Sequence, residues 1–454
     1  MKKKKPTGAS KMPPGPLAQK WVARDHAVIS PSYTRQYPLV VESAKGSFVT
    51  DVDKNQFLDF TSGIAVTATG HCHPKVVRAI CAQAKRFIHM SGTDFYYPQE
   101  VLLAERLSEL AEGCPLKKNA PSPWKVFFTN SGTESIEAAM KIARYHTKRP
   151  YFISFLGSFH GRTFGALSLT GSKAVHRNRF APLVPTVLHV PYPNPYRPPV
   201  GVSSNDCGAH SLSFISDYLF RHLVNPTEVA AIFVEPIQGE GGYIVPPLDF
   251  LQGLSNLARE FGILIVFDEV QCGIGRTGKF FAYEHFGITP DIITVAKGIA
   301  SGLPLGAMMA KSDLMDWEPG AHANTFGGNP IACEAALVTL DLVQNKLMQN
   351  AQKIGAFLLS QLKEIQKRHR LIGDVRGLGL MIGIELVKDQ ETKTPAIAER
   401  NQIIQSCFEQ GLLVLGCGVS TVRFAPPLTI SRAEAQKGLD IFEEAIASVK
   451  RTIW

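Results

Sequence analysis

A carboxylate and an amine stand 29 residues apart in this chain, each at the end of a short apolar run. Asp268 directly follows the run 262–267, and Lys297 comes two residues after the run 292–295. Short apolar runs bounded by turn residues are typical of strands in a buried parallel sheet. Ligands of such sheets bind at the carboxyl ends of the strands, so we expect both side chains to project into one crevice.

This pair could bind and activate an aldehyde cofactor. Desolvation at a strand end lowers the pKa of an ammonium group, which would let Lys297 act as a nucleophile and form a Schiff base with pyridoxal phosphate (PLP). A buried carboxylate such as Asp268 would hold the proton that the ring nitrogen of PLP needs to act as an electron sink. The alternative is a solvated lysine and an aspartate that caps a loop, and this stretch alone does not decide between the two.

Three other strand ends carry polar residues. The turn 130–134 lies between an apolar strand and a helix, where free backbone N–H groups could bind an anion, or where Ser131 or Thr133 could simply cap the helix. Segment 157–163 places an aromatic, a histidine and an arginine after a strand, which suits a flat anionic ligand or a surface loop. Segment 235–242 places two glutamates among glycines, which suits an ion pair or a solvated loop.

The elements that must position these residues alternate between strand and helix from about residue 125 to 310, which is the α/β pattern. We therefore predict an α/β fold in which a large domain contains a mostly parallel central sheet. From about residue 346 the pattern changes to α+β, which predicts a smaller domain formed by the C-terminal part together with the N-terminal segment. Residues 183–210 are rich in proline and are expected to form an irregular surface excursion.

The expected domain limits are as follows: a disordered basic tail at 1–18, an N-terminal segment at 19–69 that packs with the small domain, a large domain at 70–335, and a small α+β domain at 336–454. The 454 residues have a formal charge of +9, of which five lysines in the tail supply five. The remaining charge is ordinary, so we expect no nucleic-acid partner. No apolar run has the length of a membrane span, so we expect no membrane partner.

The eight cysteines are scattered and no two have CxxC spacing, so we expect neither a disulfide framework nor a metal site. The segment His71-Cys72-His73 resembles a ligand cluster, but adjacent residues of an extended chain point to opposite sides. The tail lacks the features of a secretion signal or a transit peptide. The predicted localisation is therefore the reducing cytoplasm.

The motifs in order resemble those of the class III aminotransferases, which are PLP enzymes of fold type I. The resemblance covers about residues 25–450 and is greatest to 4-aminobutyrate and acetylornithine/ornithine aminotransferases. The segments that carry it are SGTES (131–135), FHGRT (159–163), EPIQGEGG (235–242), DEVQCGIGRTG (268–278), AKGIASG (296–302), NTFGGNP (324–330) and VRFAPPLT (422–429).

The resemblance implies a role for each matching residue of the cofactor site. Lys297 matches the Schiff-base lysine, which also moves a proton between the substrate and the cofactor. The other matching residues are Asp268 at the ring nitrogen, Val270 under the ring, Gln271 near the phenolic oxygen, Phe159 stacked on the opposite face, and Gly132 and Thr133 at the phosphate. Thr325 matches a phosphate ligand donated by a second subunit, which implies a homodimer or a larger assembly of it.

The resemblance also implies a switch between two substrates. Arg162 matches the arginine that binds the distal carboxylate, and Ile64 matches a residue of the substrate channel. Arg423 matches the arginine that binds the α-carboxylate of a 2-oxo acid, and Glu240 matches the glutamate that pairs with Arg423 while an ω-amine is bound. The closed pair would present a neutral surface, and the open pair would admit 2-oxoglutarate.

The favoured function is therefore a PLP-dependent aminotransferase that moves an amino group from an ω-amino acid such as 4-aminobutyrate to 2-oxoglutarate by a ping-pong mechanism. An acetylornithine/ornithine aminotransferase is one alternative. A PLP-dependent amino-acid racemase is another, because racemases of this class also resemble the chain, including in segment 191–197 (PYPNPYR). A non-catalytic protein of this fold would be expected to lose Lys297 or Asp268, and both are present.

Overall fold

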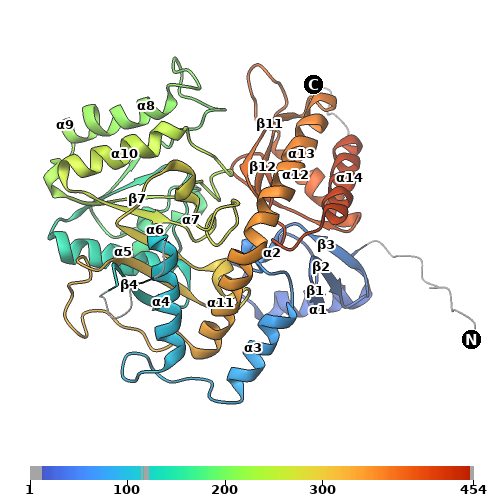
Figure 1. Cartoon of the computed structure of the whole chain (residues 1–454). Coiled ribbons are helices and arrows are strands. Elements are labelled where there is room, and N and C mark those ends of the chain that lie inside the picture. The colour runs from blue at the N-terminus through green and yellow to red at the C-terminus, as the bar shows by residue number, and fades with distance from the viewer. Residues whose placement is uncertain (1–12, 114–115, 117–121, 450–454) are drawn as a thin grey trace, which may run out of the picture.

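The computed structural model describes residues 13–113, 116 and 122–449. A large body built on a seven-stranded sheet lies beside a smaller one that combines the C-terminal part of the chain with the N-terminal strands (Figure 1). The predicted α/β fold with a mostly parallel large sheet and a smaller α+β unit is confirmed. The exact domain limits stay a prediction.

The large sheet has the strand order β4-β10-β9-β8-β7-β5-β6. Strand β10 is antiparallel to both of its neighbours, and the other pairs are parallel. Strands β7 and β9 are buried along their whole length, as strands covered by helices on both faces must be. The bounds are β4 Trp124–Thr129, β5 Tyr151–Phe155, β6 Val187–Val190, β7 Val229–Val234, β8 Leu264–Asp268, β9 Ile292–Val295 and β10 Gly306–Lys311.

Three helices of the large body, α5, α10 and α11, have clear capping residues at one end. The Ser131 hydroxyl accepts from the Glu134 N–H at the start of α5, and the Asn329 side chain accepts from two N–H groups at the start of α11. Gly262, in the left-handed conformation, ends α10. The bounds are α2 Ser62–Ala65, α3 Pro74–Ala84, α4 Pro98–Glu112, α5 Gly132–Thr147, α6 Phe164–Leu169, α7 Ala174–Arg177, α8 Cys207–Ser213, α9 Phe220–His222, α10 Leu248–Phe261 and α11 Pro330–Leu342.

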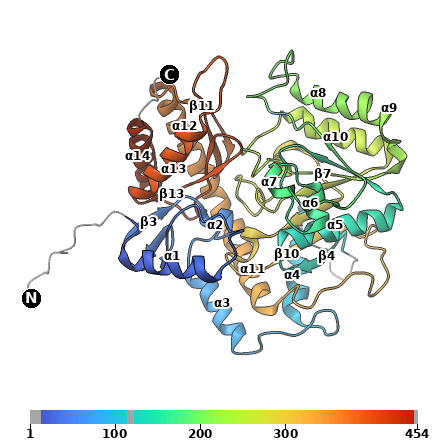
Figure 2. The ribbon, with the colours of Figure 1, turned by 180° about the vertical axis from the view of Figure 1, so that it is seen from behind.

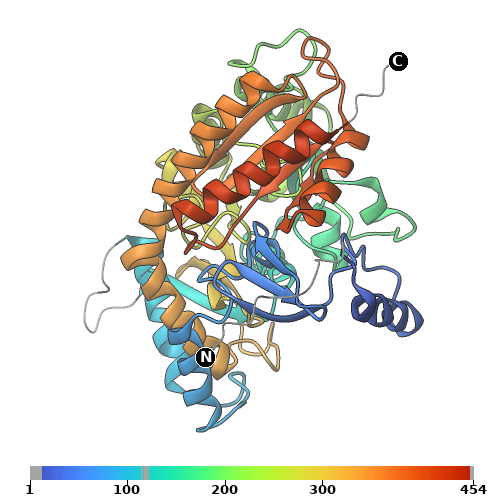
Figure 3. The same ribbon diagram turned by 90° about the vertical axis from the view of Figure 1, so that its right-hand side faces the viewer.

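The smaller body contains two four-stranded sheets, with orders β11-β12-β15-β14 and β1-β2-β3-β13. The second sheet joins the two ends of the chain, because β13 pairs in parallel with β3. A π-helical segment, Val343–Leu347, connects α11 to α12, and α12 and α14 pack side by side (Figure 3). The bounds are β1 Val41–Lys45, β2 Phe48–Asp51, β3 Gln56–Asp59, α12 Met348–Arg368, β11 Ile372–Leu378, β12 Met381–Leu386, α13 Ile397–Glu409, β13 Leu412–Leu413, β14 Leu415–Cys417, β15 Thr421–Phe424 and α14 Arg432–Ser448.

Aromatic packing locks the N-terminal segment onto the C-terminal unit. The Phe60 ring meets Phe424 edge-on at 5.0 Å between centroids, and Phe424 meets Phe442 in the same way at 5.0 Å. All three rings are fully buried. Edge-to-face pairs of this kind add to the free energy that burial of the rings already supplies.

Two expectations from the sequence are wrong in detail. The proline-rich range 183–210 contains β6, which pairs in parallel with β5 at the edge of the large sheet, and it also contains the start of α8. The tail predicted to be disordered at 1–18 overlaps helix α1 (Pro16–Val28), which lies beside β1–β3 (Figure 2). The two carboxylate oxygens of Asp53 accept the Leu17 and Ala18 N–H groups at 3.0 and 2.8 Å. Residues 1–12 of the predicted tail lie outside the described residues.

Smaller differences occur at element ends. The strand expected from Gly262 begins at Leu264, because the Ile263 N–H still donates to Ala258 of α10. The apolar residues 412–417 are divided between β13 and β14, which belong to different sheets. Within the described ranges, the structure has no helix both long and apolar enough to cross a bilayer.

Candidate active site

The carboxyl ends of four neighbouring strands open into one cavity of about 450 Å³. Strand β8 ends in Asp268 and β9 leads to Lys297, while the loops after β5 and β7 bring the 159–162 segment and Glu235. The cavity is lined by Val66, Asn130, Ser131, Gly132, Thr133, Phe159, His160, Gly161, Arg162, Glu235, Asp268, Val270, Gln271, Ala296, Lys297 and residues 302–305. Eight predicted site residues that are far apart in the chain therefore share this cavity.

Lys297 is held in an uncommon backbone conformation next to β9. Its φ angle is +37°, in the left-handed region that side chains other than glycine rarely adopt. Burial lowers the pKa of the Lys297 ammonium group, while the nearby carboxylates of Asp268 and Glu235 oppose that shift. A lowered pKa leaves more of the amine neutral at a given pH, and only the neutral amine is a nucleophile.

Asp268 is fixed by two hydrogen bonds. Its Oδ1 accepts the Val270 N–H at 3.0 Å, and its Oδ2 lies 2.7 Å from His160 Nδ1. Both side chains are almost wholly buried. The pair presents a negative charge with a fixed orientation to the floor of the cavity, and the sequence did not assign any role to His160.

Glu235 is a second buried carboxylate that sequence reasoning did not single out as a site residue. Its two oxygens accept the N–H groups of Phe159 at 2.9 Å and Gly239 at 2.8 Å. Burial and the neighbouring Asp268 raise the pKa of Glu235 to about 7. Glu235 therefore ties together the loops that follow β5 and β7.

The amino end of α5 forms a close-fitting anion cradle. The first N–H groups of a helix have no intrahelical acceptor, and the residues Ser131, Gly132 and Thr133 at the start of α5 line the cavity. A Cβ atom on Gly132 would lie 2.7 Å from Val270 Cγ1. A Cβ atom on Gly161, whose φ is +141°, would lie 2.2 Å from Thr133 Oγ1. Glycine at both positions lets the backbone approach a bound group closely.

These residues fit PLP. The cradle suits a dianionic phosphate, Val270 and Phe159 supply two apolar surfaces for a ring, and Asp268 supplies the anion for the ring nitrogen. Gln271 Oε1 and His160 Nε2 are buried and have no hydrogen-bond partner among the described residues. Buried polar atoms without a partner are uncommon in folded proteins and point to a missing ligand.

Glu240 and Arg423 form an ion pair between the two bodies of the molecule. Arg423 Nη1, on β15, lies 3.2 Å from Glu240 Oε2. The other oxygen of Glu240 lies 2.5 Å from Lys173 Nζ, in the segment before α7. The local charge of this group is therefore not neutral, as the sequence predicted for the pair alone, but positive by one. Neither member of the pair lines the cavity described above.

Arg162 is exposed and lines the cavity, with its guanidinium 5.8 Å from the centroid of the Phe159 ring. The His176 ring meets the Phe159 ring edge-on, at 5.5 Å between the ring centroids. Burial and the neighbouring Arg162 lower the pKa of His176. Arg162 is thus a cation at the cavity beside an apolar ring, which suits a substrate carboxylate.

Two further predicted residues, besides Glu240 and Arg423, do not line this cavity in the chain described here. Ile64 is 45% exposed and has a left-handed φ of +67°, and Val66 lines the cavity in its place. Thr325 is exposed and is not among the lining residues. The role that the sequence predicted for Thr325, as a phosphate ligand donated to a second copy of the chain, stays a prediction.

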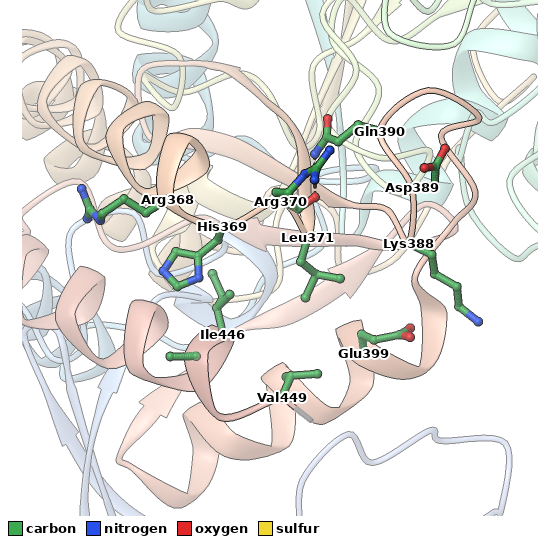
Figure 4. Close-up of a pocket in the computed structure, with 11 residues that line it drawn as sticks. Arg368, His369, Arg370, Leu371, Lys388, Asp389, Gln390, Glu399, Ile446 and Val449 are labelled. Carbon is green, nitrogen blue, oxygen red and sulfur yellow. Dashed lines mark hydrogen bonds between the residues drawn. The ribbon is translucent and has the colours of Figure 1, made fainter. Parts of the chain in front are cut away.

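A second cavity, of about 460 Å³, lies in the C-terminal unit and is rich in basic residues (Figure 4). Two of these side chains already have a partner, since Arg368 and His369 both contact the Glu443 carboxylate, at 2.8 and 3.2 Å. The Gln390 amide donates to the Arg370 and Ile372 carbonyls instead of facing open space. We assign no function to this cavity.

The fold and the site define an enzyme that uses PLP bound at the carboxyl edge of an α/β sheet. Residues 29–446 match the aminotransferase class-III family, so the chain belongs to this family of PLP-dependent transaminases.

The chain is 41% identical to a leucine/methionine racemase of Thermococcus litoralis, over 91% of each chain. It is 39% identical to the 5-aminovalerate aminotransferase DavT of Pseudomonas aeruginosa, over 93% of this chain and 96% of that one. Among solved structures, an aminotransferase of Bacillus anthracis matches with a TM-score of 0.85 at 31% identity, covering 95% of this chain and 99% of that one.

Proposed function

We propose that this enzyme transfers an amino group from an ω-amino acid such as 4-aminobutyrate to 2-oxoglutarate in a ping-pong reaction. The observation that carries the proposal is the ion pair between Glu240 and Arg423, 3.2 Å apart. A cation that binds the α-carboxylate of a 2-oxo acid must be masked while an ω-amine occupies the same place. A carboxylate of the protein itself, such as that of Glu240, can cover the cation reversibly.

In the donor half-reaction the pair is closed. Glu240 then covers Arg423, and the amine end of the donor, which bears no carboxylate, lies against the closed pair. The distal carboxylate of the donor binds Arg162, whose planar guanidinium suits a bidentate contact. Arg162 lies at the cavity beside Phe159, which supports this assignment.

In the acceptor half-reaction Glu240 turns away and Arg423 binds the α-carboxylate of 2-oxoglutarate. Arg162 again binds the distal carboxylate. Arg423 is almost wholly buried, which strengthens its attraction for a carboxylate relative to that in water. Two arginines at opposite ends of the site therefore favour a dicarboxylate acceptor over a monocarboxylate.

PLP, when bound, withdraws electrons from the substrate carbon that carries the amine. With PLP bound, Lys297 would serve as the base that moves the proton at that substrate carbon, a role that its lowered pKa supports. Asp268, oriented by His160, holds the proton on the ring nitrogen. The first turn of α5 binds the phosphate.

We also propose that the working unit is a homodimer in which Thr325 completes the phosphate site of the partner. The 88–97 loop and the loop that bears Thr325 pack together: the Thr93 hydroxyl donates to the Asn324 carbonyl at 3.0 Å, and the His89 and Phe326 rings lie 5.1 Å apart. Phe326 is 61% exposed and Tyr96 is fully exposed. Large exposed apolar side chains on one pair of loops favour a protein interface.

The test is a scan of half-reactions. The holoenzyme is mixed separately with 4-aminobutyrate, 5-aminovalerate, ornithine, acetylornithine, β-alanine and several D- and L-α-amino acids, and the loss of the visible cofactor band is followed. Conversion by an ω-amine that 2-oxoglutarate reverses is the expected result. If no ω-amine converts the cofactor, the proposal is wrong.

An amino-acid racemase is the second candidate, because the chain is 41% identical to a leucine/methionine racemase of Thermococcus litoralis. Racemisation needs no 2-oxo acid acceptor, so it would not require Glu240 to cover Arg423. The same scan separates the two candidates: a racemase would abolish the optical rotation of an α-amino acid without net change in the cofactor band.

A further inference from the structure

Glu240 is held by two cations from opposite sides of the site. Arg423 comes from β15 in the C-terminal unit, and Lys173 comes from the segment that precedes α7 in the large body. Each cation occupies a different oxygen of Glu240: Oε2 faces Arg423 at 3.2 Å, and Oε1 faces Lys173 at 2.5 Å. One of these contacts can therefore break while the other persists.

The two cations differ in burial. The Arg423 side chain is 9% exposed and that of Lys173 is 38% exposed, while that of Glu240 is 17% exposed. Releasing Glu240 from Arg423 without another partner would leave a carboxylate unpaired in a mostly buried place, which carries a large free-energy penalty. Lys173 is placed where it removes that penalty.

We propose that Lys173 is a positioning residue that retains Glu240 when Arg423 is given over to the carboxylate of the acceptor. This inference rests on the proposed function, since it concerns the switch of the same site. Lys173 keeps the Glu240 carboxylate on the side of the site that the large body forms. Glu240 can therefore leave Arg423 while it stays paired with Lys173. Lys173 thereby sets the affinity of the enzyme for the acceptor without touching the acceptor.

The groups that face Glu240 are Arg423 from β15, Lys173 and His176 from the α7 segment, Arg400 from α13, Tyr243 from the loop of Glu240 itself, and Cys417 from β14. Burial lowers the pKa of His176 and raises those of Tyr243 and Cys417 to about 12. The shifts move the pKa of His176 down, and those of Tyr243 and Cys417 up, away from the range between about pH 6.5 and 8.5. Glu235 in the cavity, with a pKa of about 7, is present in the wild type and in every Lys173 variant. The difference in pH dependence between Lys173→Met and the wild type therefore reports on Glu240.

The pH dependence follows from the ion pairs. In the wild type, Arg423 and Lys173 hold the pKa of Glu240 below its ordinary value, even though burial opposes them. Without Lys173, the opened Glu240 has lost both of its ion-pair partners, so its pKa rises and it takes up a proton more readily. Acceptor binding then requires a proton, so its dissociation constant rises with pH.

The experiment measures the binding of glutarate to the holoenzyme by calorimetry between pH 6.5 and 8.5. Glutarate has the two carboxylates of 2-oxoglutarate but no oxo group, so its binding does not depend on transamination. In Lys173→Met we expect weaker binding, by about three- to tenfold at pH 7.5, and a dissociation constant that rises with pH. Lys173→Arg keeps the charge and should bind as the wild type does.

Lys311→Met is the matched control, because Lys311 is also partly exposed, at 42%, and pairs with a carboxylate, Asp291, at 2.7 Å. It should leave glutarate binding unchanged. In steady state, Lys173→Met should raise the KM for 2-oxoglutarate more than it changes kcat. The cofactor spectrum and the thermal unfolding temperature of each variant establish that it is folded.

The inference is overturned if Lys173→Met binds glutarate with the affinity and pH dependence of the wild type, or if Lys311→Met shows the same loss. It is also overturned if the wild type does not bind glutarate, because Arg423 then does not accept a carboxylate. Failure of every ω-amine to react would refute the proposed transamination alone, since the glutarate measurement would still decide the role of Lys173.

Discussion

His160 Nδ1 lies 2.7 Å from Asp268 Oδ2, and both side chains are almost wholly buried below the cavity. His160 lies in the loop that follows β5, and Asp268 is the last residue of β8; β7 separates these two strands in the sheet. The imidazole therefore fixes the carboxylate in one orientation, while Asp268 Oδ1 is occupied by the Val270 N–H. This arrangement gives the cofactor site an oriented charge rather than a mobile one.

Replacement of Asp268 by asparagine should remove the charge and keep the shape. We expect the rate of the donor half-reaction to fall by about 10²- to 10⁴-fold, because the proton on the ring nitrogen is no longer held. His160→Leu should cause a smaller loss, since the charge remains and only its orientation is freed. Stopped-flow absorbance measures both rates, and an equal loss in the two variants would contradict the separate roles.

Lys297→Ala should abolish the visible absorption band of bound PLP, because no other lysine lines the cavity among the described residues. The Lys311→Met variant, which alters a lysine outside the cavity, should keep the band. The measurement is an absorption spectrum of each purified protein after incubation with PLP. An unchanged band in Lys297→Ala would show that another amine binds the cofactor.

The reaction of the PLP-free protein with PLP should depend on pH through Lys297. Burial lowers the pKa of this amine, so the neutral, reactive form appears at a lower pH than for a free lysine. The rate of reconstitution should rise with pH and level off below the ordinary pKa of lysine. A midpoint at or above that ordinary pKa would mean that Lys297 is solvated or paired with an acid in the PLP-free protein.

Gly132→Ala should weaken the binding of PLP. The added Cβ would lie 2.7 Å from Val270 Cγ1, and the β-branched valine has little rotamer freedom to move away. Overpacking of this kind costs about 1–3 kcal/mol, so we expect a loss of affinity of about tenfold or more. In Gly132→Ala with Val270→Ala the clash is absent and part of the affinity should return. No recovery in the double variant would mean that the effect arises elsewhere.

Glu240→Ala should impair the donor half-reaction more than the acceptor half-reaction. Removal of the carboxylate leaves Arg423 unmasked, which repels the positively charged amine and attracts the wrong end of the donor. Binding of 2-oxoglutarate needs Arg423 free, so it should be retained or improved. Single-turnover rates of the two half-reactions give the comparison, and an equal loss in both would argue against a switch.

Eight of the predicted site residues line one cavity because they lie at or soon after the end of a strand, or at the start of a helix. Runs of buried apolar residues define the strands, and parallel strands end at the same edge of a sheet, so Asp268 and Lys297 could be placed together without coordinates. Glu235 follows β7 in the same way, but a glutamate beside glycines resembles an ordinary loop until its burial is known.

The contacts that sequence reasoning missed depend on distances between segments far apart in the chain. Helix α1 begins where Asp53, 36 residues from Leu17, accepts its free N–H groups. Strand β6 is concealed by the prolines around it and is recognised only by its pairing with β5. Neither local composition nor periodicity records such partners.

The sequence by itself determined the α/β class and the placement of Lys297 and Asp268 at one edge of the sheet, because those follow from local pattern and from the order of the strands. The roles of the two residues at PLP follow from the family resemblance. Only the tertiary structure decided that His160 orients Asp268, that Ile64 faces solvent, and that Lys173 shares Glu240 with Arg423. The physical reason is that an ion pair or a buried hydrogen bond depends on a few ångströms between side chains, and chain packing sets those distances.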